Sequence, residues 1–148
     1  MLNTLLLIFC AMTFSGSIES TGLLRRIAEP IVKYAQNTGS LIATTASTCI
    51  FFNITTSDQY MSIVVPGRMF ADTYKEKRLA PENLSRTLED SGTVTSVLIP
   101  WNSCGATQSA VLGVATLTYL PFCFFNLLSP LMTIAYGYLG IKIKILNK

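Results

Sequence analysis

The sequence contains no histidine, which excludes imidazole metal ligands and catalysis by a histidine base. Its four cysteines form no CxxC pair and lie in apolar stretches, as is typical of packing residues rather than of disulfides or metal ligands. Charged residues make up only 13% of the 148 residues, and the net charge of +3 is spread over separate loops. The sequence therefore predicts neither an enzyme nor a partner of nucleic acids.

Charge is absent for longest between Asp90 and Lys142, where 51 consecutive residues carry none. A soluble domain cannot hide so long an apolar stretch, whereas a bilayer takes about 20 apolar residues for each helical crossing. Half of all residues are hydrophobic, and the mean hydropathy is +0.46. The sequence therefore predicts an all-α integral membrane protein with a single membrane domain, residues 1–148.

The charged loops divide the chain into about three transmembrane helices and a re-entrant helical hairpin. Both loops that flank the hairpin are basic, so they are expected to share the cytoplasmic face. Gly92 is expected to stop a surface helix that precedes the uncharged run. The first crossing also resembles a secretory signal peptide, although no lysine or arginine precedes its apolar core. The expected elements are a transmembrane helix over 2–18, the re-entrant hairpin over 38–71, the surface helix over 81–91, a broken transmembrane helix over 93–116 and a transmembrane helix over 118–141.

The turn of the predicted hairpin contains an acid, Asp58. An ionised carboxylate at bilayer depth costs on the order of 2.5–3.5 kcal/mol, so it requires a cation or a proton. Hydroxyl and amide oxygens around it suit a hard cation such as Na⁺, and desolvation favours a proton on the same carboxylate once the cation leaves. The alternative is that Asp58 only caps the helix that follows. The candidate ion-binding and proton-coupling residues are Asp58 with Asn53, Thr55, Thr56, Ser57 and Gln59.

A second polar break lies within the predicted crossing over 93–116. Pro100 removes a backbone donor and Gly105 loosens the turn that follows, so Asn102 and Ser103 lie where the helix is interrupted. One interpretation is a proline kink whose freed carbonyls are satisfied by neighbouring side chains. The other is that Asn102 and Ser103 complete one midplane ion site with the first break, and two such breaks in a short chain favour it.

Three further charged residues are candidates for an entrance or a gate. Arg68 lies near the exit of the hairpin, where it would anchor at the membrane interface or pair with an acid such as Asp72. Glu89 and Asp90 come just before a crossing, where they would gather cations at an entrance or serve as ordinary surface acids.

Long strings at these two breaks carry a resemblance to a known family. Residues 53–70 (NITTSDQYMSIVVPGRMF) and residues 84–105 (LSRTLEDSGTVTSVLIPWNSCG) closely resemble the NhaC family of Na⁺/H⁺ antiporters, and the resemblance extends over nearly the whole chain. It implies the fold of the ion-transporter superfamily, in which inverted repeats each contain a re-entrant hairpin and a discontinuous helix. Family members are several times longer, so the resemblance implies one repeat from their C-terminal portion.

The resemblance also implies a function, secondary transport that exchanges Na⁺ for H⁺ without a cofactor. It implies a multi-pass protein of a bacterial cytoplasmic membrane. The expected partners are the lipid bilayer and either the remaining half of the antiporter or a second copy of this chain. Two alternatives are cation-coupled exchange of organic acids such as malate and lactate, known in the same family, and a truncated membrane protein that does not transport.

Overall fold

The computed structural model describes residues 37–146, together with the isolated positions Leu6, Phe9, Cys10, Thr13, Ser17 and 20–22. The predicted crossing over 2–18 therefore lies outside the described residues, apart from such isolated positions. Within residues 37–146 the regular elements are helices, accompanied by an isolated antiparallel bridge between Leu79 and Ile145. The all-α class predicted from the sequence is confirmed for this part of the chain.

Two long helices, α3 (Thr38–Thr56) and α4 (Gln59–Glu76), form a helical hairpin. The chain turns between them at Ser57, which adopts the left-handed conformation with φ 60°, and at Asp58. The sequence places the turn at the same residues because hydroxyl, amide and carboxylate side chains compete with the helix for backbone groups. The hairpin continues to Glu76, beyond the predicted end at residue 71.

The next helix differs from its prediction. The elements α5 (Pro81–Leu88), η1 (Glu89–Thr93, a π-helical turn) and α6 (Val94–Ser96) follow one another without a break. The expected boundary between a surface helix over 81–91 and a crossing that starts at residue 93 is therefore absent. A Cβ on Gly92 would lie 3.1 Å from Cγ1 of Ile63 in α4, so this glycine permits close helix packing rather than a helix stop.

The C-terminal part of the chain is bent. It contains α7 (Ser103–Leu112), α8 (Thr116–Tyr119), the 3₁₀ turn η2 (Leu120–Phe122) and α9 (Phe124–Leu139). Among the described residues, every single helix is too short or too polar to cross a membrane alone. The pair Thr116–Phe122 and Phe124–Leu139 has the required length and composition when taken together, with a bend of 59° between its halves. The transmembrane helix predicted over 118–141 corresponds to this bent pair, and Pro121 lies next to the bend.

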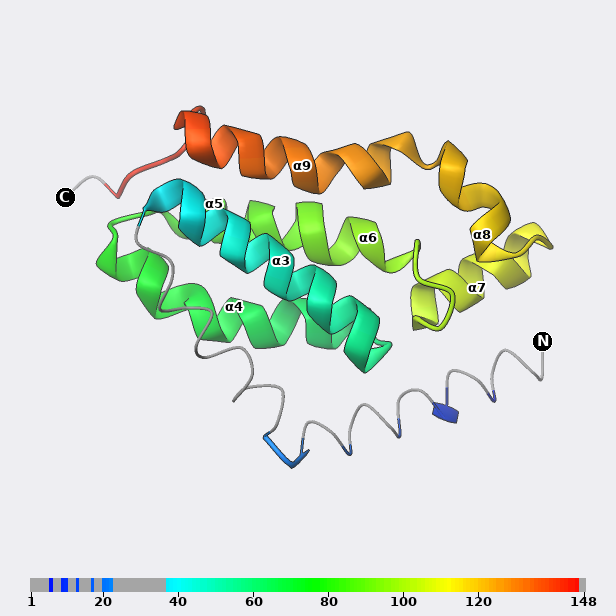
Figure 1. The fold of residues 1–148 in the computed structure, drawn as a ribbon. Coiled ribbons are helices and arrows are strands. Elements are labelled where there is room, and N and C mark those ends of the chain that lie inside the picture. Colours follow the sequence, from blue (N-terminus) through cyan, green and yellow to red (C-terminus); the bar gives the residue numbers. More distant parts are fainter. Residues whose placement is uncertain are drawn as a thin grey trace.

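Helix α3 lies between α9 and α4, and Figure 1 shows the three side by side. The core cluster comprises Leu41, Ile42, Cys49, Phe70, Tyr74, Leu79, Leu84 and Leu88, drawn from α3, α4, α5 and the turn before α5. The segment after α9 lies beside the turn between α4 and α5. There the N–H of Ala80 donates to the carbonyl of Lys144 over 3.0 Å. The N–H of Leu146 donates to the carbonyl of Arg78 over 2.8 Å, so the segment after α9 is bonded to the exit of the hairpin.

Hydroxyl side chains in the interior bond to their own helix. Thr45 donates to the carbonyl of Leu41 over 2.8 Å, and Thr87 donates to the carbonyl of Asn83 over 2.8 Å. Such bonds to the residue four positions earlier satisfy the hydroxyl locally. The hydroxyl of Thr45 also accepts from the hydroxyl of Tyr74 in α4 over 3.4 Å, so a hydroxyl satisfied on its own helix can still link two helices.

Glycine permits the close crossing of α3 and α9. A Cβ on Gly39 of α3 would lie 2.9 Å from Cα of Tyr138, and a Cβ on Gly137 of α9 would lie 3.1 Å from Cβ of Ile42. Small residues at such crossings let two helix backbones approach, which is the usual source of packing energy between membrane helices.

We predict that Gly39→Ala lowers the free energy of unfolding by about 1–3 kcal/mol, because the new methyl group meets backbone that cannot move aside. Chemical denaturation in detergent, followed by circular dichroism, measures the change. The matched control is Gly67→Ala in α4, where the added Cβ would meet only the flexible Cδ1 of Leu88, at 3.2 Å. Equal stability of the two variants would contradict the close crossing.

Candidate functional site

The two polar breaks identified in the sequence lie against each other in the structure. The α3–α4 turn meets the segment 97–102, which separates α6 from α7. The N–H of Ser103 donates to the carbonyl of Ser57 over 3.0 Å, and the indole N–H of Trp101 donates to the carbonyl of Ile54 over 2.8 Å. The last carbonyls of a helix lack partners within that helix, so the second break caps the C-terminal end of α3.

A pair of buried asparagines joins the two breaks. Asn53 of α3 and Asn102, the N-cap of α7, are both 0% exposed. Nδ2 of Asn102 donates to Oδ1 of Asn53 over 3.2 Å, and its Oδ1 accepts from the N–H of Cys104 over 3.1 Å. Nδ2 of Asn53 donates to the carbonyl of Gly92 over 2.6 Å and to Oγ1 of Thr95 over 3.1 Å. Since an unsatisfied buried amide costs about 1–3 kcal/mol, this network holds α3, η1 and α7 together.

Side chains from three helices also satisfy carbonyls of the π turn, of α6 and of the break. The bond from Asn53 to the carbonyl of Gly92 is one of them. Nδ2 of Asn126 in α9 donates to the carbonyl of Val94 over 2.8 Å. The hydroxyl of Tyr119 in α8 donates to the carbonyl of Val97 over 2.6 Å. Irregular backbone at membrane depth requires such partners. The interpretation of the second break as a kink satisfied by its neighbours therefore agrees with the structure. Its role as half of an ion site stays a prediction.

Gln59, the first residue of α4, links the hairpin to both sides of the second break. Its Oε1 accepts from Oγ of Ser96 over 3.2 Å and from Sγ of Cys104 over 2.6 Å. Gly105 permits the chain to fold closely here, because a Cβ on it would lie 2.0 Å from the carbonyl oxygen of Ile99. Helices α4, α6 and α7 thus converge on one amide side chain.

Asp58 lies at this junction and is half-buried. Its carboxylate accepts from the N–H of Tyr60 over 3.2 Å, which makes it the N-cap of α4, as the capping interpretation predicted. No ion pair involves Asp58 among the described residues, and within them the hydroxyls of Ser57 and Ser103 make no hydrogen bond. Capping uses only part of the acceptor capacity of a carboxylate. Within the described residues, the second carboxylate oxygen of Asp58 and these two hydroxyls therefore have no hydrogen-bond partner.

The other predicted site residues of the hairpin turn have local partners. Thr55 donates to the carbonyl of Phe51 over 2.8 Å, and Thr56 donates to the carbonyl of Phe52 over 2.7 Å. Their hydroxyls therefore satisfy themselves on α3. The predicted ligands thus fall into three groups: amides that hold the junction, threonines that bond within the hairpin, and a carboxylate with two serine hydroxyls that have acceptor capacity left among the described residues.

The candidates for an entrance or a gate lie elsewhere. Arg68 is exposed on α4, and within the described residues it forms no ion pair with Asp72. Glu89 is exposed, whereas Asp90 accepts a hydrogen bond from Thr133 of α9. Sequence reasoning missed the contribution of α9, although polar residues such as Asn126 and Thr133 in an uncharged segment are the signal that marks such contacts.

We predict that Asn53→Ala and Asn102→Ala each destabilise the fold by about 1–3 kcal/mol, because each leaves buried groups without partners. The double variant should cost less than the sum of the two, with a coupling free energy on the order of 0.5–3 kcal/mol. Denaturant titrations of the wild type, the two single variants and the double variant give the free energies of unfolding for a double-mutant cycle. Thr55→Val is the control, since its hydroxyl bonds only within α3. Additive effects of the two alanine substitutions would show that the breaks are independent.

Comparison with known proteins adds evolutionary evidence to this geometry. The chain is 43% identical over 143 residues to the Na⁺/H⁺ antiporter NhaC of Alkalihalophilus pseudofirmus, an alignment that covers 97% of this chain and 31% of that protein. It is 42% identical over 136 residues to the arginine/ornithine antiporter ArcD of Halobacterium salinarum, covering 92% of this chain and 28% of that protein. It is 31% identical over 140 residues to the malate-2H⁺/Na⁺-lactate antiporter of Bacillus subtilis, covering 95% of this chain and 30% of that protein.

The chain thus spans between 28% and 31% of the length of these curated relatives. No solved structure matches it. The Na⁺/H⁺ antiporter family matches residues 1–141, which is nearly the whole chain. This chain therefore belongs to the Na⁺/H⁺ antiporter family, whose members are membrane transporters and not enzymes.

Proposed function

We propose that this chain carries a cation-exchange site for Na⁺/H⁺ antiport, in which Asp58 binds Na⁺ and H⁺ in turn. The observation that supports it is a half-buried carboxylate without an ion pair in the described structure, located where two helix breaks meet. A carboxylate at membrane depth is stable only when a cation or a proton neutralises it. Competition between the two at one acid is the minimum requirement for exchange.

The ligands that suit Na⁺ best are the oxygens that the junction leaves unused. These are the second carboxylate oxygen of Asp58 and the hydroxyls of Ser57 and Ser103, whose backbones are joined by a hydrogen bond of 3.0 Å. A nearby cation lowers the pKa of a carboxyl, so Na⁺ arriving at Asp58 expels its proton, and departure of Na⁺ lets the proton return. Of the remaining candidate ligands, Asn53, Asn102 and Gln59 act mainly by holding the two breaks in place, and Thr55 and Thr56 satisfy carbonyls of the hairpin itself.

The proposed membrane arrangement follows from the faces that the helices leave exposed. The outer surface of η2 and α9 is apolar and exposed, which suits contact with lipid chains, and the bent pair would be a crossing. The hairpin α3–α4 would be re-entrant, with its turn at the midplane and its exit bonded to the segment after α9. The exposed apolar residues are Phe122, Phe124, Phe125, Leu127, Leu128, Leu131 and Met132.

In this arrangement the chain corresponds to one inverted repeat in a bacterial cytoplasmic membrane. The complete transport path would then require the other half of the antiporter or a second copy of this chain. This follows because a midplane site in such transporters forms where two repeats meet.

A cationic amino acid is the second candidate substrate, since a relative named as an arginine/ornithine antiporter is 42% identical and an acidic site suits a cationic side chain. Organic-acid exchange has less support. A carboxylate substrate would require a basic group in the site, and Arg68 is exposed on α4.

We predict that Asp58→Asn abolishes Na⁺-dependent proton release, because the amide neither binds a proton nor carries a charge for Na⁺. The chain is reconstituted in vesicles that contain a pH-sensitive dye, and the internal pH is followed after addition of NaCl or of arginine hydrochloride. Asp72→Asn is the matched control, since Asp72 is exposed on the same helix, away from the junction. Equal, measurable rates for wild type and Asp58→Asn would refute the proposal, whereas no Na⁺ response from the wild type would show that the other half of the antiporter is required. A response to arginine alone would favour the second candidate.

A further inference from the structure

Isoleucine and lysine alternate in the segment that follows α9. After Gly140, which ends the helix in the left-handed conformation, the chain reads Ile141, Lys142, Ile143, Lys144 and Ile145. Both lysines are exposed, and Ile145 remains 65% exposed although it bridges Leu79 at the exit of the hairpin. Exposed apolar side chains beside basic ones are typical of segments at the boundary between lipid chains and headgroups.

Positive charge is concentrated at this end of the molecule. Residues 75–82 and 140–146 contain five basic and two acidic residues. Lys144 pairs with Glu82 over 3.5 Å, but the two side chains are 69% and 65% exposed, so water screens the pair. The surplus of three positive charges lies on one surface, because backbone hydrogen bonds join the two segments.

An open groove of about 440 Å³ lies between the first turn of α3, the end of α9 and the segment after α9. This volume falls within the range of roughly 300–1,000 Å³ that is usual for ligand pockets. The polar part of the lining includes Thr38 and Lys77. The apolar wall is formed by Leu79, Tyr138, Ile143 and Ile145.

The apolar wall of the groove is bordered by basic residues. Arg78 and Lys142 are both exposed, and each directly precedes a residue of that wall. Tyr138 is 65% exposed, and an aromatic ring beside basic residues is typical of the membrane interface. The groove thus combines a positively charged rim with an apolar wall that is open to the surroundings.

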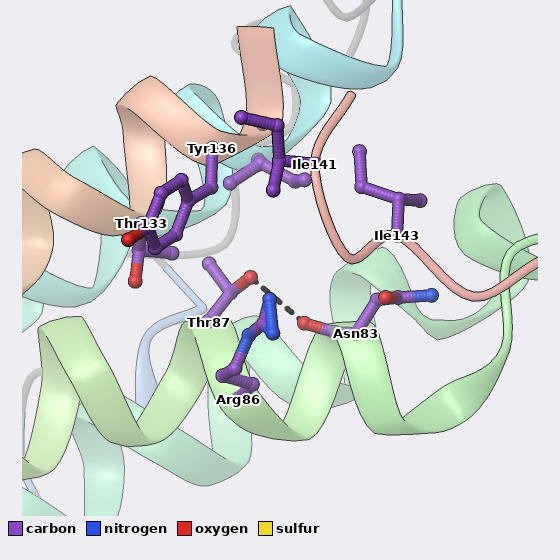
Figure 2. Close-up of a pocket in the computed structure, with 9 residues that line it drawn as sticks. Asn83, Arg86, Thr87, Thr133, Tyr136, Ile141 and Ile143 are labelled. Carbon is purple, nitrogen blue, oxygen red and sulfur yellow. Dashed lines mark hydrogen bonds between the residues drawn. The ribbon is translucent and has the colours of Figure 1, made fainter. Parts of the chain in front are cut away.

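A second, smaller pocket lies along the same segment. Figure 2 shows Ile141 and Ile143 across this pocket from Asn83 and Arg86 of α5. The volume of about 10 Å³ suffices for a single water molecule at most, so of the two hollows the groove is the one with room for a larger group. Arg86 is exposed and adds a further base near the segment.

We propose that the groove binds an anionic phospholipid of the cytoplasmic leaflet, with its phosphate at Lys77 and Lys142 and an acyl chain along Tyr138 and Ile145. Basic residues at a membrane surface attract anionic lipids, and the exposed apolar wall suits the chain of the same molecule. A soluble anion would use the basic rim but leave the exposed isoleucine in water. The position of the groove at the membrane surface rests on the proposed arrangement, in which the exit of the hairpin faces the cytoplasm, whereas the choice of ligand rests on the lining residues.

Native mass spectrometry of the purified full chain in detergent tests the proposal by measuring bound lipid. Phosphatidylglycerol should bind about tenfold or more tightly than phosphatidylcholine with the same acyl chains. Lys142→Gln should weaken binding of phosphatidylglycerol about fivefold, the factor that one basic residue contributes near an anionic membrane. Ile145→Thr should weaken binding of both lipids, because it removes part of the apolar wall. Circular dichroism checks that each variant keeps its helix content.

The matched control is Lys75→Gln, which removes the same charge from an exposed residue of α4 that does not line the groove. It should bind phosphatidylglycerol as the wild type does, and so should Asp58→Asn, because the groove does not depend on antiport. An equal loss in Lys75→Gln and Lys142→Gln would show that net charge alone attracts the lipid and would overturn the groove as its site.

Three other results would also overturn the proposal. One is equal affinity for the two lipids, since the basic rim would then have no role. Another is displacement of phosphatidylglycerol by inorganic phosphate at the same concentration, which would identify a site for a free anion. The third is a dimer of the chain that forms only without phosphatidylglycerol and is lost in Ile145→Thr, which would assign the groove to a second copy of the protein.

Discussion

The requirement that every backbone polar group find a partner away from water determines this structure. The chain interrupts its helices at residues 57–58 and at residues 97–102, and each interruption leaves carbonyls without partners. The hydrogen bonds between Asn53 and Asn102 bring the two interruptions together so that each supplies what the other lacks. The end of α3 receives donors from the second break, and the π turn receives an amide from α3.

The sequence grouped all polar residues of the two breaks as candidate ion ligands, whereas the structure distinguishes residues that hold the junction together from the acid Asp58. Amide side chains form the fixed part, since Asn53 and Asn102 are fully buried and use both ends of their amides. The acid Asp58 is half-buried and makes one capping bond. Under the proposed function, a rigid frame around a carboxylate that forms no ion pair within the described residues would let the site exchange its ion without rearranging the core.

The sequence predicted best the features that depend on local chemistry. The turn at Ser57 and Asp58 and the break around Pro100 were predicted because serine, aspartate and proline compete with or remove helical hydrogen bonds, although Pro66 and Pro130 lie inside α4 and α9. The continuation of the helix through Gly92 was not predicted, since the role of this glycine depends on its contact with Ile63 of another helix. The pairing of Thr133 with Asp90 could not be predicted for the same reason. The sequence marked the polar residues but contained no information on which helix each would face.

The short segment that follows α9 has a mechanical consequence. Its backbone is bonded to Arg78 and Ala80, and the backbone N–H and carbonyl of Lys144 bond to the amide of Asn83 over 3.1 and 2.6 Å. These bonds tie the far end of α9 to the base of the hairpin, so the two must shift as one unit. A movement of this unit relative to the rest of the chain would therefore have to occur at its opposite end, where the helices are interrupted. Those interruptions are the break beside Trp101 and the 59° bend ahead of α9.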